Sequence, residues 1–441
     1  MAGRLDLASS DVKFSFDRQV KIADPEGPSS LLSNLDSVSA PDDTTVVFKL
    51  KSANDQTFPQ VLSSPVGPIV DEQVFSATKV TPAATIVKGK AFGGQYGIDS
   101  YKENQTVKYS PNKNYQGLLG KAKNSGVTTA YYTNASNMKL DVQNGNIDVA
   151  YRSFSATDID SLRKDKDVKV WDGPGGELRF ITFNFDTQPF GTKQSGADPK
   201  KALAVRQAVA DLVDREAIAK SVYRNTYTPL YSYIPEGLTG ANESLKSLYG
   251  DGQGGPSKEK AAKVLKDAGI PTPVKLDLQY NPDHYGPSSG EEYARVKDQL
   301  QSSGLFTVKL QSTEWTQYSK DRVSDVYPSY QLGWFPDFSD ADNYMSPFFL
   351  PGKDAKGKVA PGGFLLNHYN NPSVDKLINQ QRSTADRAKR TQIIGQAQDA
   401  LAKDLSTLPL LQGKQVAVSG ADVSGVTLDA SFRFRYAPLT K

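Results

Sequence analysis

An indole and a carboxylate stand close together at the end of one apolar segment. Residues 330–334 alternate as in a strand that ends on Trp334, and Asp337 follows three residues later, after Phe335 and Pro336. In open α/β sheets, ligands bind in the crevice beyond the carboxyl ends of the strands. A carboxylate and an aromatic ring in that place can grip a cation or an amphipathic ligand. The same pattern also fits a Trp334 packed in the core and an Asp337 that caps a turn, and the pattern alone favours this second interpretation.

Three carboxylates within six residues, those of Asp337, Asp340 and Asp342, raise the alternative of a calcium site. A calcium loop needs a glycine at its sharp turn and a distal bidentate glutamate. Neither accompanies these aspartates, so the spacing argues against calcium.

Two glycine-rich segments imitate nucleotide-binding motifs. Gly250–Gly255 satisfies G-x-G-x-x-G, but residues 241–249 do not form the strand that a dinucleotide site requires. Gly352–Lys358 resembles a phosphate loop, yet Val359 replaces the Ser or Thr that ligates magnesium. We interpret both segments as surface loops and predict no cofactor.

The composition removes several classes of function. The chain has no cysteine, which excludes disulfides, thiolate nucleophiles and iron–sulfur clusters. Its two histidines, His284 and His368, lack the spacing of metal ligands and are expected to be surface or hydrogen-bonded residues. The 52 Lys and Arg residues against 49 Asp and Glu are spread along the chain, so no basic face for nucleic acid is predicted.

Neither a membrane span nor an export signal is visible in the sequence. No apolar run approaches the length that crosses a bilayer. Met1–Asp6 contains no apolar core and is not a signal peptide. We therefore expect either a cytosolic protein or a chain that begins downstream of its export segment.

The elements that must position these side chains follow from hydrophobic periodicity. Strand patterns and helix patterns alternate after residue 200, which is typical of a parallel or mixed sheet flanked by helices. Ser257 and Ser373 are expected to cap helices, and Gly269 to end the first of them. The predicted strands are 46–50, 178–185, 276–280, 306–310 and 330–334, and the predicted helices 205–213, 257–268, 293–300, 315–322, 374–378 and 394–401. The expected fold class is α/β with at least two lobes.

Several short stretches occur together in one order and with one spacing. They are Ser10–Ser15 with Arg18, Phe92–Tyr96, Asn112–Tyr115, Gly145–Ala150, Phe183-Asn184 with Pro189-Phe190 and 205–208, Gly333–Tyr344, and Asn370–Asp375. The stretch 145–150 resembles "G-x-I-D-x-A", and 333–344 resembles "G-W-x-x-D-Y-x-D-P-D-N-F". Through them nearly the whole chain resembles the extracytoplasmic solute-binding proteins of peptide ABC importers, the oligopeptide/dipeptide/nickel-binding family.

The resemblance implies a ligand-binding role for five residues. In peptide-binding members, an aspartate at the place of Asp337 holds the α-ammonium of the ligand, and a tryptophan at the place of Trp334 borders the cleft. Trp315 and Arg322 match two further residues that line this cleft. Gln331 stands where an oligopeptide binder has an arginine for the C-terminal carboxylate, which leaves the length and even the peptide nature of the ligand open.

A second departure from the family concerns the N-terminal part. The family's "D-V-x-F-S" stretch comes well inside the mature chain, but here it begins near residue 9. We therefore expect the export signal, its lipid-anchoring cysteine and one ligand-contacting strand to be absent from this polypeptide.

The resemblance implies a two-lobed fold of the periplasmic-binding-protein-like II type with a partial accessory domain. The expected division is 1–92 for the accessory domain and a remnant of lobe I, 93–182 for lobe I, 183–422 for lobe II and 423–441 for a return to lobe I. It further implies an extracytoplasmic monomer that closes by hinge rotation on a peptide and delivers it to membrane permease subunits.

Two alternatives remain open at this stage. Within the family, the ligand could instead be an oligosaccharide, a metal chelate or another small metabolite. Outside it, a secreted hydrolase would use paired carboxylates such as Asp337 and Asp340, although nothing else in the sequence asks for an enzyme.

Overall fold

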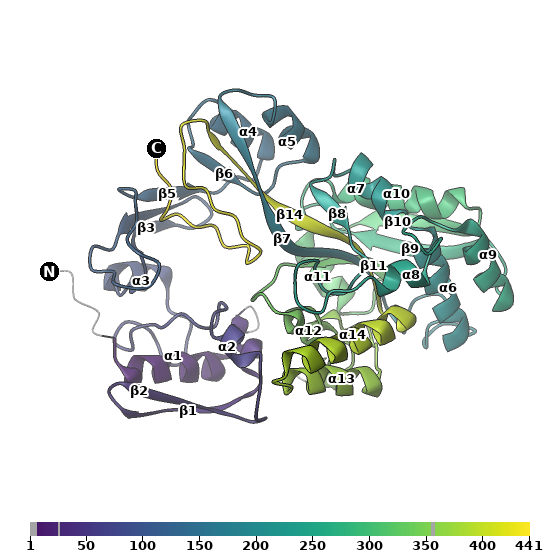
Figure 1. Cartoon of the computed structure of the whole chain (residues 1–441), viewed down its shortest axis with the longest axis horizontal. Coiled ribbons are helices and arrows are strands. Elements are labelled where there is room, and N and C mark those ends of the chain that lie inside the picture. Colours follow the sequence, from purple (N-terminus) through teal and green to yellow (C-terminus); the bar gives the residue numbers. More distant parts are fainter. Residues whose placement is uncertain (1–6, 25–26, 354–357) are drawn as a thin grey trace.

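The computed structural model describes residues 7–24, 27–353 and 358–441. The N-terminal hexapeptide and most of the phosphate-loop-like segment Gly352–Lys358 lie outside these described residues. Figure 1 shows an N-terminal unit, an upper lobe and a larger second lobe, with two long strands crossing between the lobes.

The N-terminal unit consists of a helix packed on a hairpin. Strands β1 (Leu35–Asp42) and β2 (Thr45–Leu50) pair antiparallel, and α1 (Ser9–Ile22) covers them. The alternation at 46–50 thus forms the predicted strand. The remaining short elements are η1 (Pro28–Leu32), α2 (Phe58–Val61) and α3 (Ala83–Gly89).

One residue from the far part of the chain completes the core of this unit. Phe16, Leu35 and Phe58 are buried in a cluster that also contains Phe338. Because Phe338 directly follows Asp337, the segment beyond β11 is anchored in the N-terminal unit.

The first lobe, which is the upper one in Figure 1, carries a three-stranded antiparallel sheet and two short helices. The strand order is β3-β4-β5, and α3 packs on β3. Its elements are β3 (Tyr96–Lys102), β4 (Thr106–Pro111), β5 (Val127–Ala130), α4 (Ala135–Gln143), β6 (Val149–Tyr151) and α5 (Ala156–Leu162). The C-terminal segment returns to this lobe, where Asn124 Nδ2 donates to the carbonyls of Tyr436 and Leu439.

A seven-stranded mixed sheet joins the two lobes. Its order is β10-β9-β11-β7-β14-β6, with β8 paired to β14. β9, β10 and β11 run parallel, whereas β11 and β14 flank β7 in antiparallel pairing. The strands not yet bounded are β7 (Val168–Phe183), β8 (Tyr227–Pro229), β9 (Val274–Tyr280), β10 (Phe306–Ser312), β11 (Ser329–Trp334) and β14 (Thr407–Gly420).

Helices cover this sheet in the second lobe, and they bury its largest core. The helices are α6 (Pro199–Leu212), α7 (Arg215–Ser221), α8 (Ser244–Leu248), α9 (Lys258–Asp267), α10 (Ser289–Ser302), α11 (Trp315–Arg322), α12 (Ser346–Phe349), α13 (Pro372–Arg382) and α14 (Arg387–Asp404). Two 3-10 turns, η2 (Ala341–Tyr344) and η3 (Gly363–Leu365), and the two-residue strands β12 (Gly352–Lys353) and β13 (Val359–Ala360) complete it.

One predicted helix start is confirmed and one is wrong. Ser257 caps α9 by accepting a hydrogen bond from the backbone of Lys260, and Gly269 follows the helix with a positive φ. In α13, however, Asn371 is the cap and Ser373 lies inside the helix. The reason is Pro372, whose fixed φ suits the first helical position and therefore places the cap one residue before it.

The strands β7 and β14 run between the lobes as a long antiparallel pair. The first half of β7 pairs with the end of β14 near β6, and its second half pairs with β11. The register shifts between Gly413 and Gln415, opposite residues 173–177. There a Cβ on Gly175 would overlap the carbonyl oxygen of Gly413, so only glycine fits this close approach. Among the described residues, no helix is long and apolar enough to cross a membrane.

Candidate ligand-binding site

Asp337 lies just beyond the C-terminal end of β11, and its carboxylate is half-buried. Asn343 Nδ2 donates to Asp337 Oδ2 at 3.3 Å. Burial raises the pKa of the Asp337 carboxyl, while the hydrogen bond from Asn343 and the charge of Arg433 act in the opposite direction. A partly desolvated anion of this kind gains strongly from a cationic partner.

Asn343 ties the carboxylate and the indole together, and sequence reasoning missed this role. This fully buried amide accepts hydrogen bonds through Oδ1 from Trp334 Nε1 and from the backbone of Asp337, both at 2.9 Å. Its presence in the quoted stretch 333–344 was a signal, but periodicity assigns no role to a buried amide. The turn-capping role considered for Asp337 falls instead to Asp340, whose side chain caps η2.

Trp334 is partly buried and packs with one side on the core. Its ring lies edge-on to Phe348 at 4.9 Å and 5.9 Å from Phe364. The packing expected from the second interpretation therefore coexists with a fixed indole beside Asp337.

Arg322 points into the second lobe rather than toward solvent. Its Nη1 donates to the carbonyl of Phe364 at 2.9 Å, and its guanidinium carbon lies 4.4 Å from the centroid of the Phe364 ring. The side chain is buried, and its Nε has no hydrogen-bond partner. In this arrangement Arg322 supports the ring that packs on Trp334.

Gln331 is completely buried inside the second lobe. Its Oε1 accepts from the backbone and the side chain of Asn281, each at 3.1 Å, and its Nε2 donates to Ser289 Oγ at 3.2 Å. Its amide is therefore engaged within the lobe, and contact with a ligand stays a prediction.

Trp315 opens α11 and forms an aromatic wall with a residue not predicted for the site. Its ring stacks on His284 at 3.7 Å between centroids and 6° between planes. Burial lowers the pKa of His284 to about 4, so this imidazole is neutral at physiological pH. A neutral, flat and partly buried pair of this kind suits an apolar or aromatic ligand group.

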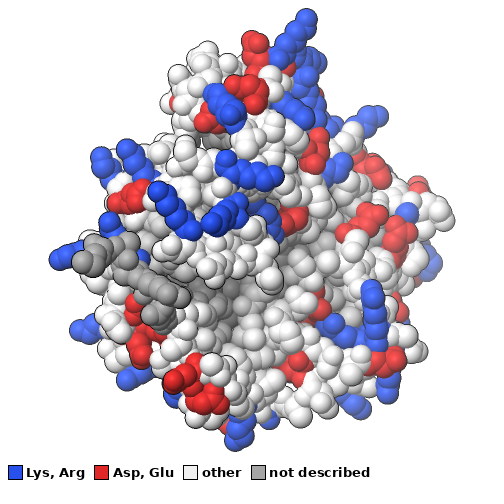
Figure 2. All heavy atoms as spheres, turned by 60° about the vertical axis from the view of Figure 1, so that its left-hand side comes forward, with Lys and Arg blue, Asp and Glu red and all other residues white. Residues whose placement is uncertain are grey.

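Two hollows adjoin the crossing strands. One, of about 130 Å³, lies between the lobes and is lined by Arg152, Phe154, Glu177, His284, Phe335 and Phe432, among others. The other, of about 600 Å³, is lined by residues 173–176, 235–238, Ser339 and Tyr344, among others. Figure 2 shows a face hollowed near its centre, with Lys and Arg side chains above the hollow.

None of the five predicted residues is among those that line either hollow, but neighbours of some of them are. Phe335 lines the first hollow and Ser339 the second, which places Asp337 on the short segment between them. His284, the stacking partner of Trp315, also lines the first hollow. The structure thus brings Trp334 and Asp337 together and puts Trp315 close to the inter-lobe space, whereas Arg322 and Gln331 face the interior.

A buried ion cluster, of which Glu177 and Arg179 line the first hollow, was also missed. Arg179 Nε donates to Glu177 Oε1 at 2.7 Å, and Arg179 Nη1 lies 3.6 Å from Glu292 Oε2. Tyr223 donates to Glu292, and Tyr227 to Glu177. Burial raises the pKa of Glu292, which the charge of Arg179 opposes. A buried charge must be paired, and here each has a partner before any ligand binds.

Comparison with known proteins identifies the family. The profile described as "Bacterial extracellular solute-binding proteins, family 5 Middle" matches residues 5–356. The chain therefore belongs to this family of extracellular solute-binding proteins.

Named relatives are similar along most of the chain. Di/tripeptide-binding protein 1 of Pseudomonas aeruginosa is 24% identical over 419 residues, which cover 92% of this chain and 73% of the relative. The dipeptide-binding protein of Escherichia coli is 23% identical over 409 residues, covering 89% of this chain and 71% of the relative.

A solved structure shares the fold. The ABC transporter-associated periplasmic binding protein of Helicobacter pylori, in complex with the peptide STSA, superposes with a TM-score of 0.77 at 19% identity. The match covers 98% of this chain and 81% of the other. The predicted α/β class and two-lobed periplasmic-binding-protein fold are confirmed.

Proposed function

We propose that this protein captures short peptides between its two lobes and delivers them to an ABC importer. Membership of the solute-binding family and the similarity to di- and tripeptide-binding proteins support this function. The observation that carries the proposal is the half-buried carboxylate of Asp337, held beside Trp334 by the buried amide of Asn343.

Asp337 would fix the register of the peptide. Its carboxylate pairs with the α-ammonium, and this charge-assisted bond strengthens once closure of the lobes excludes water. The peptide backbone is held by strand-like hydrogen bonds, which do not depend on side chains. Trp334 provides one apolar wall for the side-chain pockets. The stacked pair of Trp315 and His284 provides another.

We retain Arg322 and Gln331 as proposed ligand contacts, although both side chains would have to reorient to reach the ligand. Both side chains are used inside the second lobe. Contact with a carboxylate would require Arg322 to leave the carbonyl of Phe364. Its unpaired Nε supplies one donor that is not yet committed.

We place the hinge of closure at residues 173–176 and at Gly413. The two crossing strands change register there, whereas the pairing of β7 continues through residues 182 and 183. The proposed lobes are otherwise those expected from the sequence, with residues 423–441 packed on the first lobe.

We further propose that the protein acts outside the cytoplasm, binds its ligand without transforming it and docks as a monomer on membrane permease subunits. The extracellular character of the family supports the location, and its description as solute-binding supports binding without catalysis. Anchoring of the protein by a lipid stays a prediction.

Calorimetry with alanine di-, tri- and tetrapeptides and their N-acetylated forms tests the proposal. Removing the ammonium should cost about 2–5 kcal/mol of binding free energy, because Asp337 is then left buried and unpaired. Equal affinity for the free and the acetylated peptides would contradict the role of Asp337.

A thermal-shift screen separates the alternative ligands, since only a ligand of the native state raises the melting temperature. Peptides should raise it, whereas oligosaccharides and metal chelates that release no free ion should not. A shift with an oligosaccharide or a chelate, and none with any peptide, would assign the cleft to that ligand instead.

A further inference from the structure

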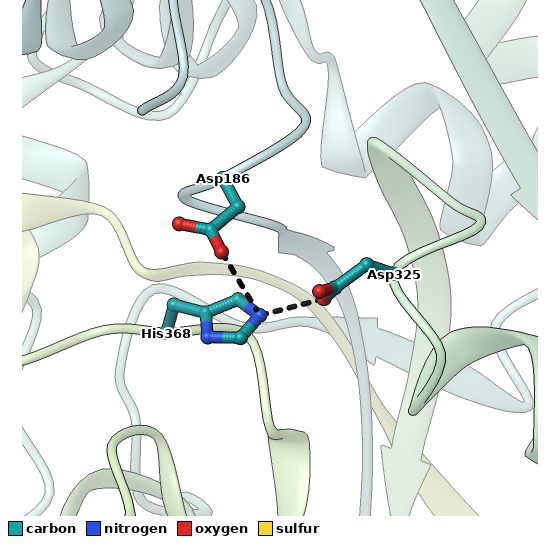
Figure 3. Close-up of side chains that lie close together, drawn as sticks. All are labelled: Asp186, Asp325 and His368. Carbon is teal, nitrogen blue, oxygen red and sulfur yellow. Dashed lines mark hydrogen bonds and ion pairs between the residues drawn. The ribbon is translucent and has the colours of Figure 1, made fainter. Parts of the chain in front are cut away.

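A histidine and two aspartates converge on the second lobe, and none of them lines either hollow. Figure 3 shows the three side chains pointing toward one another from separate segments. Asp186 follows β7, Asp325 lies between α11 and β11, and His368 precedes α13. His368 Nε2 lies 2.6 Å from Asp325 Oδ1 and 3.4 Å from Asp186 Oδ2.

A cation already sits between the two carboxylates. Lys193 Nζ lies 2.8 Å from Asp186 Oδ2 and 3.0 Å from Asp325 Oδ2. The lysine side chain is 58% exposed, against 15% for Asp186 and 25% for Asp325. A long exposed side chain can swing into solvent, and the less exposed carboxylates would then face each other without it.

The two carboxylates are held in place by neighbours. Buried Asn184 donates through Nδ2 to Asp325 Oδ1 at 2.9 Å and accepts from the backbone of Asp186 at 2.9 Å. The hydroxyl of Thr192 donates to the other oxygen of Asp186. Hydrogen bonds of this kind orient metal ligands and raise the affinity of a site for its ion.

We propose that Asp186, Asp325 and His368 form a binding site for a divalent transition metal ion such as zinc, and that Lys193 competes with the metal for it. One imidazole nitrogen and two carboxylate oxygens are ligands that zinc accepts. The 3.4 Å between His368 Nε2 and Asp186 Oδ2 suits a tetrahedral ion with bonds of about 2.0–2.2 Å to each ligand. The 2.6 Å between His368 Nε2 and Asp325 Oδ1 is a hydrogen bond, which the ion would replace as these two atoms move apart. The imidazole argues against calcium and magnesium, which prefer oxygen ligands alone.

The bound ion would join three loops of the second lobe that are far apart in sequence. It would therefore stabilise this lobe independently of peptide binding. With three protein ligands, its fourth position is open to water.

The test titrates zinc chloride into the complete chain, free of any histidine tag and treated with a chelator. Isothermal titration calorimetry should give one equivalent of bound zinc. Thermal unfolding should show a melting temperature that rises by a few degrees at zinc saturation. His368→Gln should weaken binding by at least about tenfold. Lys193→Gln should tighten it by about threefold or more, because a competing positive charge is removed.

The chain supplies its own control, since His284 is the other of its two histidines. His284→Gln should leave zinc affinity unchanged, and X-ray absorption of the zinc complex should show one imidazole among oxygen ligands. The gain expected from Lys193→Gln cannot come from misfolding. Unchanged zinc affinity in either His368→Gln or Lys193→Gln, or a loss in His284→Gln, would overturn the proposal.

Discussion

At the scale of single residues, the site depends on how much each carboxylate is desolvated. Asp337 is half-buried with one amide donor, whereas Asp340 forms a two-pronged ion pair with Arg390 at 2.7 and 2.9 Å. Asp342 is buried and accepts from Ser346 and Gln381. Only the first of these three carboxylates is poised for an external cation.

Replacing Asp337 by alanine should weaken binding of the best alanine peptide by about 2–5 kcal/mol, because the peptide ammonium is then buried without a partner. Calorimetry measures this loss. Asp43→Ala, at an exposed carboxylate in the N-terminal hairpin, serves as the control and should bind normally. An Asp337→Ala protein with full affinity would remove the carboxylate from the site.

Asp342 should make the protein less stable as the pH rises. Burial raises the pKa of its carboxyl to about 6, although the charge of Arg382 opposes the rise. Since the folded pKa exceeds the unfolded value, the stabilising contribution is full below about pH 4 and is lost as the pH passes through 6.

The expected loss is on the order of 2–3 kcal/mol of unfolding free energy between pH 4 and pH 7. Asp342→Asn should lack this component while keeping a side-chain oxygen for Ser346 and Gln381. Urea unfolding at both pH values measures the difference between the two proteins. A constant difference would show that Asp342 does not titrate in this range.

At the scale of the elements, periodicity predicted the strands and helices that carry the site. Residues 315–322 and 330–334 lie in α11 and β11 as expected, because an alternating or helical apolar face records which side is buried. The position of Trp315 at the start of a helix, and of Trp334 and Asp337 at the end of a strand, therefore follows from the sequence pattern alone.

The buried polar partners could not be predicted in the same way. Arg179 and Glu292 lie more than a hundred residues apart in sequence, and nothing local marks either as buried. Asn343 reads as an ordinary turn residue, and the inward direction of Arg322 and Gln331 depends on the carbonyl of Phe364 and on Asn281. Such pairings are decided by tertiary contacts between distant segments.

Two glycine-to-alanine substitutions should have opposite effects. Gly175→Ala places a Cβ against the backbone of Gly413 and should destabilise the crossing of β7 and β14 by several kcal/mol. Gly395→Ala, in the middle of α14 with open space around the new methyl, should stabilise by about 0.5–1 kcal/mol. Denaturant unfolding of both variants checks the pair. If both substitutions changed the free energy of unfolding equally, the crossing of β7 and β14 would tolerate a side chain at position 175.

At the scale of the whole molecule, the lobes meet through an exposed arginine. The guanidinium carbon of Arg152, after β6, lies 4.4 Å from the ring centroid of Phe335 and 5.5 Å from that of Phe432. Phe335 and Phe432 themselves lie 5.5 Å apart. Arg152 and the C-terminal segment of the first lobe thus contact the strand end that carries Asp337.

Arg152→Ala should therefore favour a more open molecule and weaken peptide binding. Each exposed cation–π contact contributes about 0.5–1 kcal/mol, so a loss of up to about tenfold in affinity is expected. Small-angle X-ray scattering without ligand should show a larger radius of gyration, and calorimetry should show weaker binding. Lys169→Ala is the matched control, because its cation–π contact with Trp171 lies within the first lobe. If the radius of gyration and the peptide affinity of Arg152→Ala are unchanged, Arg152 has no part in closure of the lobes.

The burial of Phe338 in the N-terminal unit has a practical consequence for anyone who wishes to trim this protein into a biosensor. Cutting away the hairpin and α1 would expose Phe338, which adjoins the proposed ligand-binding residue Asp337, and would leave an apolar patch on the surface. A minimal sensor should therefore keep residues 7–69 or replace Phe338 by a polar residue.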